Sequence, residues 1–294
     1  MTAISDDALT RLRKGFGPPE FGGTRYEIVS TLGRGGMGVV YLARDTVLGR
    51  EVALKVVDAA AATEAAFEQE PRVLAQLEHP GIVPVHDFGQ LEDGRFFYAM
   101  KRIRGERLDR WAARAELHER LAAFLRVCDA VAFAHAHGVV HRDLKPDNVM
   151  VGEFGEVLVL DWGVARLAAA DADASSPVVG TPEYMAPEQA RGEAADVRAD
   201  VFSLGVLLSA LAPDVRAVQA IAAKAREVDP TRRYPTVMAL SADVSRFLAG
   251  VAVLAHRETL GERALRVGRR YRLPIALMLT YVVVRVLLIL VFRI

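Results

Sequence analysis

The sequence of 294 residues predicts an α+β fold. Short runs rich in β-branched and aromatic residues dominate residues 25–103, whereas apolar residues three and four positions apart dominate residues 104–250. A 20-residue apolar stretch, 273–292, follows a basic segment at 251–272. These observations divide the chain into a strand-rich part, a helix-rich part and a separate C-terminal helix.

The composition limits the class of protein. A net charge of zero gives no field that would recruit nucleic acid, so we expect no nucleic-acid partner. The single cysteine, Cys128, cannot form an intramolecular disulfide and lies in an apolar helical pattern, which favours a core position and a reducing compartment. Residues 1–24 contain several Gly and Pro and little periodicity, so we expect a flexible leader without a secretory signal.

A glycine cluster separates two strand-like runs within residues 26–45. Its spacing is GxGxxGxV, with Gly33, Gly35 and Gly38 followed by Val40. Glycines without side chains let backbone N–H groups approach phosphate oxygens closely. The pattern alone also fits an ordinary hairpin, and a dinucleotide-binding fold would need the glycines to open a helix, whereas VVYLA is strand-like.

The next strand, EVALKVVD, places Ala53 and Lys55 on one face. A lysine inside an apolar strand either pairs with an anion or lies on an edge that faces water. The later elements follow from composition and periodicity. They are a helix at 59–77, strands within 79–89 and 95–105, a helix at 117–137, a buried strand at 156–161, a mobile loop at 164–180, a helix at 200–211, a helical stretch at 215–228 and a last helix that ends near Leu248.

The segment HRDLKPDN holds a carboxylate, an ammonium and an amide within six residues, at Asp143, Lys145 and Asn148. Pro146 disfavours helix, and apolar runs flank the segment, so we expect a rigid loop that presents these groups together. In isolation the segment would also fit a solvated polar turn. A second carboxylate, Asp161, ends a buried strand beside a glycine, which is a common way to present oxygen ligands to a cation.

Five motifs, GRGGMGVV, VALK, HRDLKPDN, DWG and APE, follow one another within residues 25–248. In this order they resemble the eukaryotic-like, or bacterial Hanks-type, serine/threonine protein kinase family. The resemblance implies a bilobal fold with ATP between the lobes. Residues 25–103 would form a small antiparallel β lobe with one helix, and residues 104–250 a larger, mainly α-helical lobe.

The resemblance also implies a nucleotide site. Glycine backbone atoms would cover the ATP phosphates, and Lys55 would contact the α and β phosphates. The adenine pocket would combine apolar side chains, a gatekeeper and backbone atoms of the segment between the lobes. Val40 and Ala53 would supply the apolar side chains, and Met100 would be the gatekeeper. The backbone atoms would come from Lys101 and Ile103.

For the catalytic residues, the resemblance implies roles in phosphoryl transfer. Asp143 would orient the substrate hydroxyl and accept its proton, while Lys145 would neutralise the transferred group and favour serine or threonine. Asn148 and Asp161 would hold Mg²⁺, or Mn²⁺ in its place. Cations and positioning are needed because the transition state spreads negative charge over several oxygens.

Other matched positions imply structural or regulatory roles. Thr181 would brace the catalytic loop, Glu188 would pair with Arg233, and Arg142 would respond to phosphate on the activation loop. The candidate phosphorylation sites are Ser175 and Ser176, with an unmodified flexible loop as the alternative.

Three departures from the family pattern stand out. Trp162, before Gly163, replaces the usual phenylalanine. Glu70 matches the helix glutamate that pairs with Lys55, but Pro71 follows it, so Glu64 or Glu68 is the alternative partner. After Ala212 the chain omits the loop and helix that normally help to dock substrates.

The apolar stretch 273–292 has one charge, Arg285, and a length that matches a membrane span. Its apolar residues favour insertion more than Arg285 opposes it. Arginines dominate the preceding flank, so the positive-inside rule predicts the cytoplasmic membrane with the kinase lobes facing the cytoplasm. The alternative is a helix buried in the kinase core.

The sequence therefore predicts a membrane-anchored Ser/Thr protein kinase that uses ATP and Mg²⁺ on protein substrates, with self-association for trans-autophosphorylation. One alternative is a pseudokinase that binds nucleotide or partners without turnover. Intact Lys55, Asp143, Asn148 and Asp161 argue against it. A small-molecule phosphotransferase is disfavoured, because such enzymes rarely combine Lys145 with an APE segment.

Overall fold

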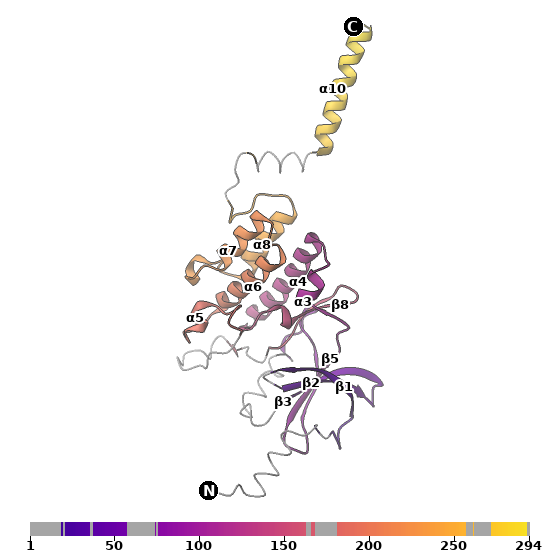
Figure 1. Ribbon diagram of the computed structural model, residues 1–294, viewed down its shortest axis with the longest axis vertical. Coiled ribbons are helices and arrows are strands. Elements are labelled where there is room, and N and C mark those ends of the chain that lie inside the picture. Colours follow the sequence, from indigo (N-terminus) through magenta and orange to yellow (C-terminus); the bar gives the residue numbers. More distant parts are fainter. Residues whose placement is uncertain are drawn as a thin grey trace.

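The computed structural model describes residues 19, 21–35, 38–57, 74, 76–162, 166–167, 181–256, 261 and 272–292. The two expected lobes are present, a β-sheet lobe at one end and a helical lobe beside it, and a separate C-terminal helix stands apart from both (Figure 1). The chain passes between the lobes through residues 102–104.

The N-terminal lobe is an antiparallel sheet of five strands in the order β1-β2-β3-β5-β4. The strands are β1 (Tyr26–Gly35), β2 (Gly38–Asp45), β3 (Arg50–Val57), β4 (Val85–Gln90) and β5 (Phe96–Lys101). Their β-branched and aromatic residues form a compact core around Tyr26, Leu54 and Phe97. The glycine-rich segment therefore joins two strands as predicted, with Gly35 opposite Gly38 at its end.

The expectation of a flexible leader that extends to residue 24 is wrong for the last residues of this segment. The Phe21 ring makes edge-to-face contacts with Tyr41 and Phe97, at centroid distances of 6.4 and 6.1 Å. Thr24 donates hydrogen bonds back to the Phe21 carbonyl through both its N–H and its hydroxyl. One aromatic side chain within a Gly-rich segment thus extends the core of the sheet.

The C-terminal lobe is built around helix α4 (Leu117–Ala136), which packs against α6 (Val197–Leu211), α8 (Val237–Leu248) and strand β9 (Val157–Val159). Cys128 is completely buried in α4, where burial raises the pKa of its thiol and keeps it in the neutral form expected of a core residue. The lobe also contains short elements near the site. These are β6 (Gly105–Arg107), α3 (Leu108–Ala112), β7 (Val139–Val140), η1 (Pro146–Asn148), β8 (Val149–Gly152), β10 (Arg166–Leu167), α5 (Pro187–Ala190) and η3 (Pro230–Arg232).

Strand β10 is a small correction to the loop expected at 164–180. Arg166 and Leu167 pair with Val140 and Val139 in an antiparallel two-stranded sheet. The remainder of that loop lies outside the described residues, as does most of the helix expected at 59–77.

The omission after Ala212 leaves α6 joined almost directly to α7 (Arg216–Ala225). Gln219 closes this short connection, because its amide donates to the carbonyl oxygens of Ser209 and Ala212, each at 2.9 Å, and accepts from the Ser209 hydroxyl. The two helices approach so closely that a Cβ on Gly205 would lie 2.7 Å from the Cβ of Ala225. The shortened connection is thus a packed, hydrogen-bonded turn.

A buried carboxylate holds the point where the chain leaves the C-terminal lobe. Asp243, fully buried on α8, accepts hydrogen bonds from the Tyr234 hydroxyl at 2.7 Å and from the N–H groups of Leu254 at 2.6 Å and Ala255 at 3.0 Å. Burial and the neighbouring carboxylate raise the pKa of Tyr234, so the tyrosine stays a donor. The segment after α8 is therefore attached to the lobe.

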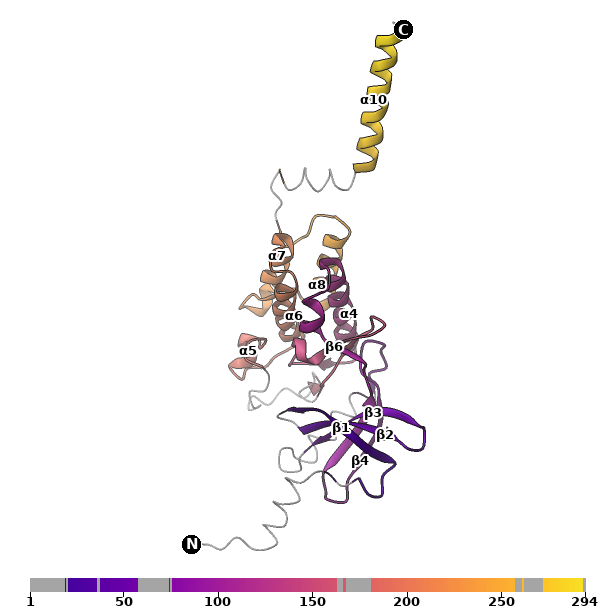
Figure 2. The same ribbon diagram turned by 45° about the vertical axis from the view of Figure 1, so that its right-hand side comes forward.

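Helix α10 (Arg272–Phe292) extends away from the two lobes in both views (Figures 1 and 2). Its large apolar side chains between Leu277 and Leu288 are 45–71% exposed, so the alternative of a helix buried in the kinase core is wrong. Side chains of α10 are described for Pro274 and residues 276–288, and within the part of the chain searched no helix is both long and apolar enough to cross a membrane.

Candidate active site

The HRDLKPDN segment forms a loop that follows β7 and ends in η1, and three of its side chains are hydrogen-bonded to one another. Asp143 is 8% exposed and both of its carboxylate oxygens are engaged. Oδ1 accepts from the N–H and the hydroxyl of Thr181, each at 3.0 Å, and Oδ2 accepts from Lys145 Nζ at 2.7 Å and Asn148 Nδ2 at 3.1 Å. Lys145 also donates to the Thr181 hydroxyl at 2.7 Å. These contacts fix the orientation of the carboxylate before any substrate binds.

The loop backbone is strained and needs support. Arg142 has a φ of 70°, in the left-handed region that residues with side chains rarely adopt. The support is Asp200 on α6, which is completely buried and accepts from the N–H groups of His141 and Arg142, both at 2.8 Å. His135 Nε2 lies 2.7 Å from the same carboxylate.

Asp200 and His135 are functional residues that sequence reasoning missed. Burial opposes ionisation of Asp200, but the hydrogen bond and charge of His135, followed by His141 and the Arg142 N–H, lower its pKa overall. The sequence does show that Asp200 is an acidic residue in the first turn of a very apolar helix. An acidic residue there is also explained by its favourable interaction with the helix dipole, so the pattern alone does not indicate a role in the site. Only its contacts with residues 58 and 59 positions away reveal its role.

His141 connects the catalytic loop to the strand that carries Asp161. Its Nε2 lies 3.0 Å from the Leu160 carbonyl, which can only accept, so Nε2 carries the proton and Nδ1 accepts from the Asp143 N–H at 3.3 Å. The imidazole also packs on the buried Trp162 ring, at a centroid distance of 4.5 Å. Tryptophan therefore fills this position as a large aromatic side chain in the core, as expected.

Lys55 and Asp161 form the second part of the site. Lys55 is 6% exposed, and its Nζ donates to Asp161 Oδ1 at 2.6 Å across 106 sequence positions. Burial raises the pKa of the Asp161 carboxyl, but the charge and hydrogen bond of Lys55, together with the charges of His141 and Lys145, outweigh burial. The net pKa therefore lies below the usual value. The lysine is thus paired with an anion inside the protein, and the water-facing alternative does not apply.

Oxygen atoms suited to a hard cation are present at the same place. Asn148 uses its amide nitrogen for the Asp143 carbonyl at 2.8 Å and for the Asp143 carboxylate, which leaves its side-chain oxygen for a ligand. The Asn148 carbonyl accepts from the Leu160 N–H at 2.8 Å, so Asn148 and the Asp161 strand are bonded neighbours. Among the described residues, no group of three or more His, Cys, Asp or Glu side chains could hold a metal ion. An amide and one carboxylate fit Mg²⁺ bound together with phosphate oxygens, because Mg²⁺ needs few protein ligands there.

The residues expected to bind nucleotide lie on adjacent strands next to Lys55. Val40 pairs with Lys55 across β2 and β3, and Ala53 pairs with Met100 across β3 and β5. Lys101 ends β5, where its N–H donates to the Pro84 carbonyl at 3.1 Å, and Ile103 follows between the lobes. Gly33 lies opposite Val40 near the end of the hairpin.

The expected link between the APE segment and the end of the lobe is also present. Glu188 and Arg233 form a buried bidentate ion pair with distances of 2.6 and 2.7 Å. Arg233 also donates to the carbonyl oxygens of Glu227, Arg198 and Val228. Nearby, Gln189 donates to the Arg142 carbonyl at 2.7 Å, so α5, the helix that begins within the APE motif (the APE helix), also holds the catalytic loop.

Some predictions lie outside the described residues and stay predictions. They concern Gly163, the phosphorylation sites Ser175 and Ser176, and the Lys55 partner at Glu70, Glu64 or Glu68. The proposed helix start or kink at Pro71 belongs to the same group.

Comparison with known proteins agrees with this geometry. The sequence profile described as "Protein kinase domain" matches residues 26–255, which is most of the chain. The chain belongs to the protein kinase family. The motifs and the paired groups of the site thus lie within a domain of that family.

Similar proteins are bacterial serine/threonine-protein kinases. The chain is 34% identical over 220 residues to PknD of Protochlamydia amoebophila, covering 62% of this chain and 22% of that protein. Over 196 residues it is 42% identical to the DNA damage-responsive kinase RqkA of Deinococcus radiodurans, covering 63% and 29%. A probable PknB of Bifidobacterium longum is 38% identical over 209 residues, covering 65% and 30%. The chain therefore spans less than a third of the length of these relatives.

Proposed function

We propose that this kinase domain transfers the γ-phosphoryl group of ATP to serine or threonine hydroxyls of proteins. The observation that carries the proposal is the Asp143 carboxylate, which Thr181, Lys145 and Asn148 hold in one orientation. The names of the bacterial relatives support the same activity and acceptor.

In the proposed mechanism, Asp143 orients the acceptor hydroxyl and takes up its proton as the oxygen attacks phosphorus. Lys145 neutralises charge on the transferred group from its position 2.7 Å from Asp143. Lys55 is held ready by Asp161 and would exchange this contact for phosphate oxygens, while Asp161 and Asn148 would hold the cation. Bound Mg²⁺ would supply positive charge beside the phosphates.

Labelled ATP tests the proposal. The full chain, purified in detergent, is incubated with Mg²⁺ and labelled ATP, and label is measured on the chain and on a generic protein substrate. We expect Asp143→Asn to lower the rate about 100-fold or more, because proton uptake and orientation are lost. Exposed Asp129 on α4 provides a matched control, and Asp129→Asn should leave the rate unchanged.

The outcome separates the two functional classes. Equal label in wild type and Asp143→Asn would refute the assignment of Asp143. If the wild-type protein binds ATP without transferring label, it is instead a pseudokinase. No contact described in the site favours that alternative. Label transferred from wild type to an Asp143→Asn chain with a different tag would establish the self-association proposed for trans-autophosphorylation.

We also propose that residues 273–292 anchor the chain in the cytoplasmic membrane with the kinase lobes in the cytoplasm. Support comes from the 20-residue apolar sequence with one charge, and from the exposed apolar side chains of α10. The arginine-rich flank before the helix favours this orientation. Release of the full-length protein from membranes by alkaline carbonate would contradict the anchor.

A further inference from the structure

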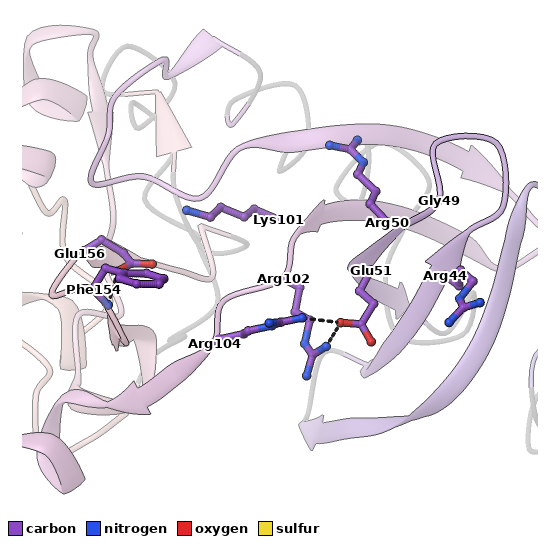
Figure 3. Close-up of a pocket in the computed structure, with 9 residues that line it drawn as sticks. All are labelled: Arg44, Gly49, Arg50, Glu51, Lys101, Arg102, Arg104, Phe154 and Glu156. Atoms are coloured by element: carbon purple, nitrogen blue, oxygen red, sulfur yellow. Dashed lines mark hydrogen bonds and ion pairs between the residues drawn. The ribbon is translucent and has the colours of Figure 1, made fainter.

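A basic hollow lies beside the segment that joins the two lobes, and of its lining residues only Lys101 is also expected to bind nucleotide, through its backbone. It has a volume of about 680 Å³, and we call it the linker pocket. Its cationic side chains come from β2, β3, the end of β5 and the linker, and they are Arg44, Arg50, Lys101, Arg102 and Arg104. Figure 3 shows Lys101 extending from β5 toward the turn that carries Phe154 and Glu156, between β8 and β9.

The linker pocket concentrates positive charge on a chain that is neutral overall. Five cationic side chains face two acidic ones, Glu51 and Glu156. Glu51 accepts from both Arg102 and Arg104, so one carboxylate is shared by two guanidinium groups. Arg44 and Lys101 have no ion pair or side-chain hydrogen bond to the part of the chain that the structure describes. The described residues therefore leave two exposed positive charges of the pocket without an anionic partner, which favours an anionic ligand.

One exposed apolar side chain lines the same hollow, and two more come directly before a lining residue in the sequence. Phe154 is 95% exposed at the tip of its turn and lines the pocket. On the N-terminal lobe, Val47 and Leu48 precede the pocket residue Gly49 and are 71% and 57% exposed. Aromatic and aliphatic groups next to arginines are typical of surfaces that bind a polypeptide segment.

We propose that the linker pocket binds an acidic segment of a protein substrate, one that carries an apolar side chain among its carboxylates. The inference rests on the proposed kinase function and adds a docking site remote from Asp143. The cations would receive the carboxylates, and Phe154 would contact the apolar side chain.

The volume of the hollow and the partial burial of Arg102 favour a peptide over a single phosphate or a membrane surface. Its volume falls within the range of sites that enclose drug-sized ligands, roughly 300–1,000 Å³, and exceeds what a single phosphate fills. A flat membrane surface would not reach recessed groups such as Arg102, whose side chain is only 27% exposed. A peptide can enter the hollow and also reach both borders.

Such a site would also serve a kinase that lacks the substrate-docking segment after Ala212. Arg44 and Arg50 belong to the N-terminal lobe and Phe154 belongs to the C-terminal lobe, so one bound segment contacts both. Docking there would raise the local concentration of the acceptor serine near the cleft without using catalytic residues.

The test compares two acceptor peptides with the same serine-containing core. One has a tail of glutamates with a single phenylalanine, and the other has glutamines in place of the glutamates. For the full-length chain we expect a lower KM for the glutamate-tailed peptide. Arg44→Gln combined with Arg104→Gln should raise that KM by about fivefold to tenfold, since two partly exposed ion pairs are lost, and should leave kcat unchanged.

A matched control removes two positive charges elsewhere. Arg232→Gln combined with Arg246→Gln changes exposed arginines outside the pocket and should leave both KM values unchanged. Phe154→Ala tests the border of the other lobe and should also raise the KM of the glutamate-tailed peptide. Equal KM values for the two tails on wild-type protein would overturn the proposal.

Binding without turnover separates this inference from the kinase function. Fluorescence anisotropy with a labelled glutamate-rich peptide, without serine or ATP, should show binding that the Arg44→Gln/Arg104→Gln variant weakens. If that holds while neither peptide is phosphorylated, the kinase proposal fails and the acidic-peptide site stands. If phosphatidylglycerol vesicles bind the wild type but not the variant and displace the peptide, the surface serves a membrane and the peptide assignment is overturned.

Discussion

Replacement of Asp200 by asparagine is the most informative perturbation of the catalytic loop. The carboxylate accepts from two backbone N–H groups on separate oxygens and from His135, all within 2.8 Å, and it is completely buried. Asparagine has the same shape but only one acceptor oxygen. The NH₂ group that replaces the second oxygen would face a donor N–H group, which would then have no acceptor.

The cost follows from these contacts. A hydrogen bond to a charged group contributes about 1.5–3 kcal/mol, and a buried donor left without an acceptor costs about 1–3 kcal/mol. We therefore expect Asp200→Asn to lower the free energy of unfolding by about 3–5 kcal/mol. For a domain of this size the melting temperature should fall by roughly 10 °C.

Activity should fall by more than the loss of folded protein explains. Without the Asp200 contacts, the strained backbone at Arg142 can relax, and Asp143 follows directly in the chain. A misplacement of about 1 Å can lower a rate about 100-fold, so we expect a decrease in kcat of that order with folded protein at 25 °C.

Thermal unfolding followed by intrinsic fluorescence, together with the peptide phosphorylation rate, measures both effects. Exposed Asp129→Asn on α4 is the control for a lost carboxylate. A shift below about 2 °C with wild-type kcat would refute the reasoning that Asp200 holds the loop.

Three further changes have defined outcomes. Gly38→Ala should raise the KM for ATP and cost about 1–3 kcal/mol, because Gly38 has a φ of 136° and a Cβ there would lie 2.2 Å from the Val56 carbonyl oxygen; an unchanged melting temperature and KM would contradict this. Arg233→Met should cost about 3–5 kcal/mol by leaving Glu188 buried without its cation, and adding Glu188→Gln should recover part of that loss in denaturant unfolding. The pKa of Asp161 is lowered on folding, so its stabilising effect should be complete above its ordinary value of 3.8 and disappear as the pH falls through the lower folded value. The difference in unfolding free energy between wild type and Asp161→Asn should therefore shrink in acid, and a difference that grew in acid would show the sign to be wrong.

Local patterns predicted most of the fold because the elements are regular and their apolar faces are buried. The helices α4, α6 and α8 and the glycine hairpin follow directly from periodicity and turn residues. The catalytic loop was predicted because its chemistry is compressed into one short segment. The order of motifs then placed Lys55 and Asp161 in the same site, although nothing local shows that their side chains meet.

What the sequence did not reveal depends on contacts between distant residues. Asp200 looks like an ordinary acidic residue near a helix N-terminus, and its role emerges only where α6 meets the catalytic loop. Phe21 lies among glycines and prolines, so no period marks it as part of the sheet core. The linker pocket likewise combines residues from both lobes, and its charge excess is hidden in a neutral chain.

The carboxylate of Asp243 has a mechanical consequence for the C-terminal helix. It accepts from the N–H groups of Leu254 and Ala255, so it attaches the start of the segment that leads toward this helix to the C-terminal lobe. Its third contact, the Tyr234 hydroxyl, leads to the neighbouring Arg233 and from there to Glu188 of the APE helix. A pulling force on the C-terminal helix would therefore act on a segment whose contacts lead, through these residues, to the helix that holds the catalytic loop.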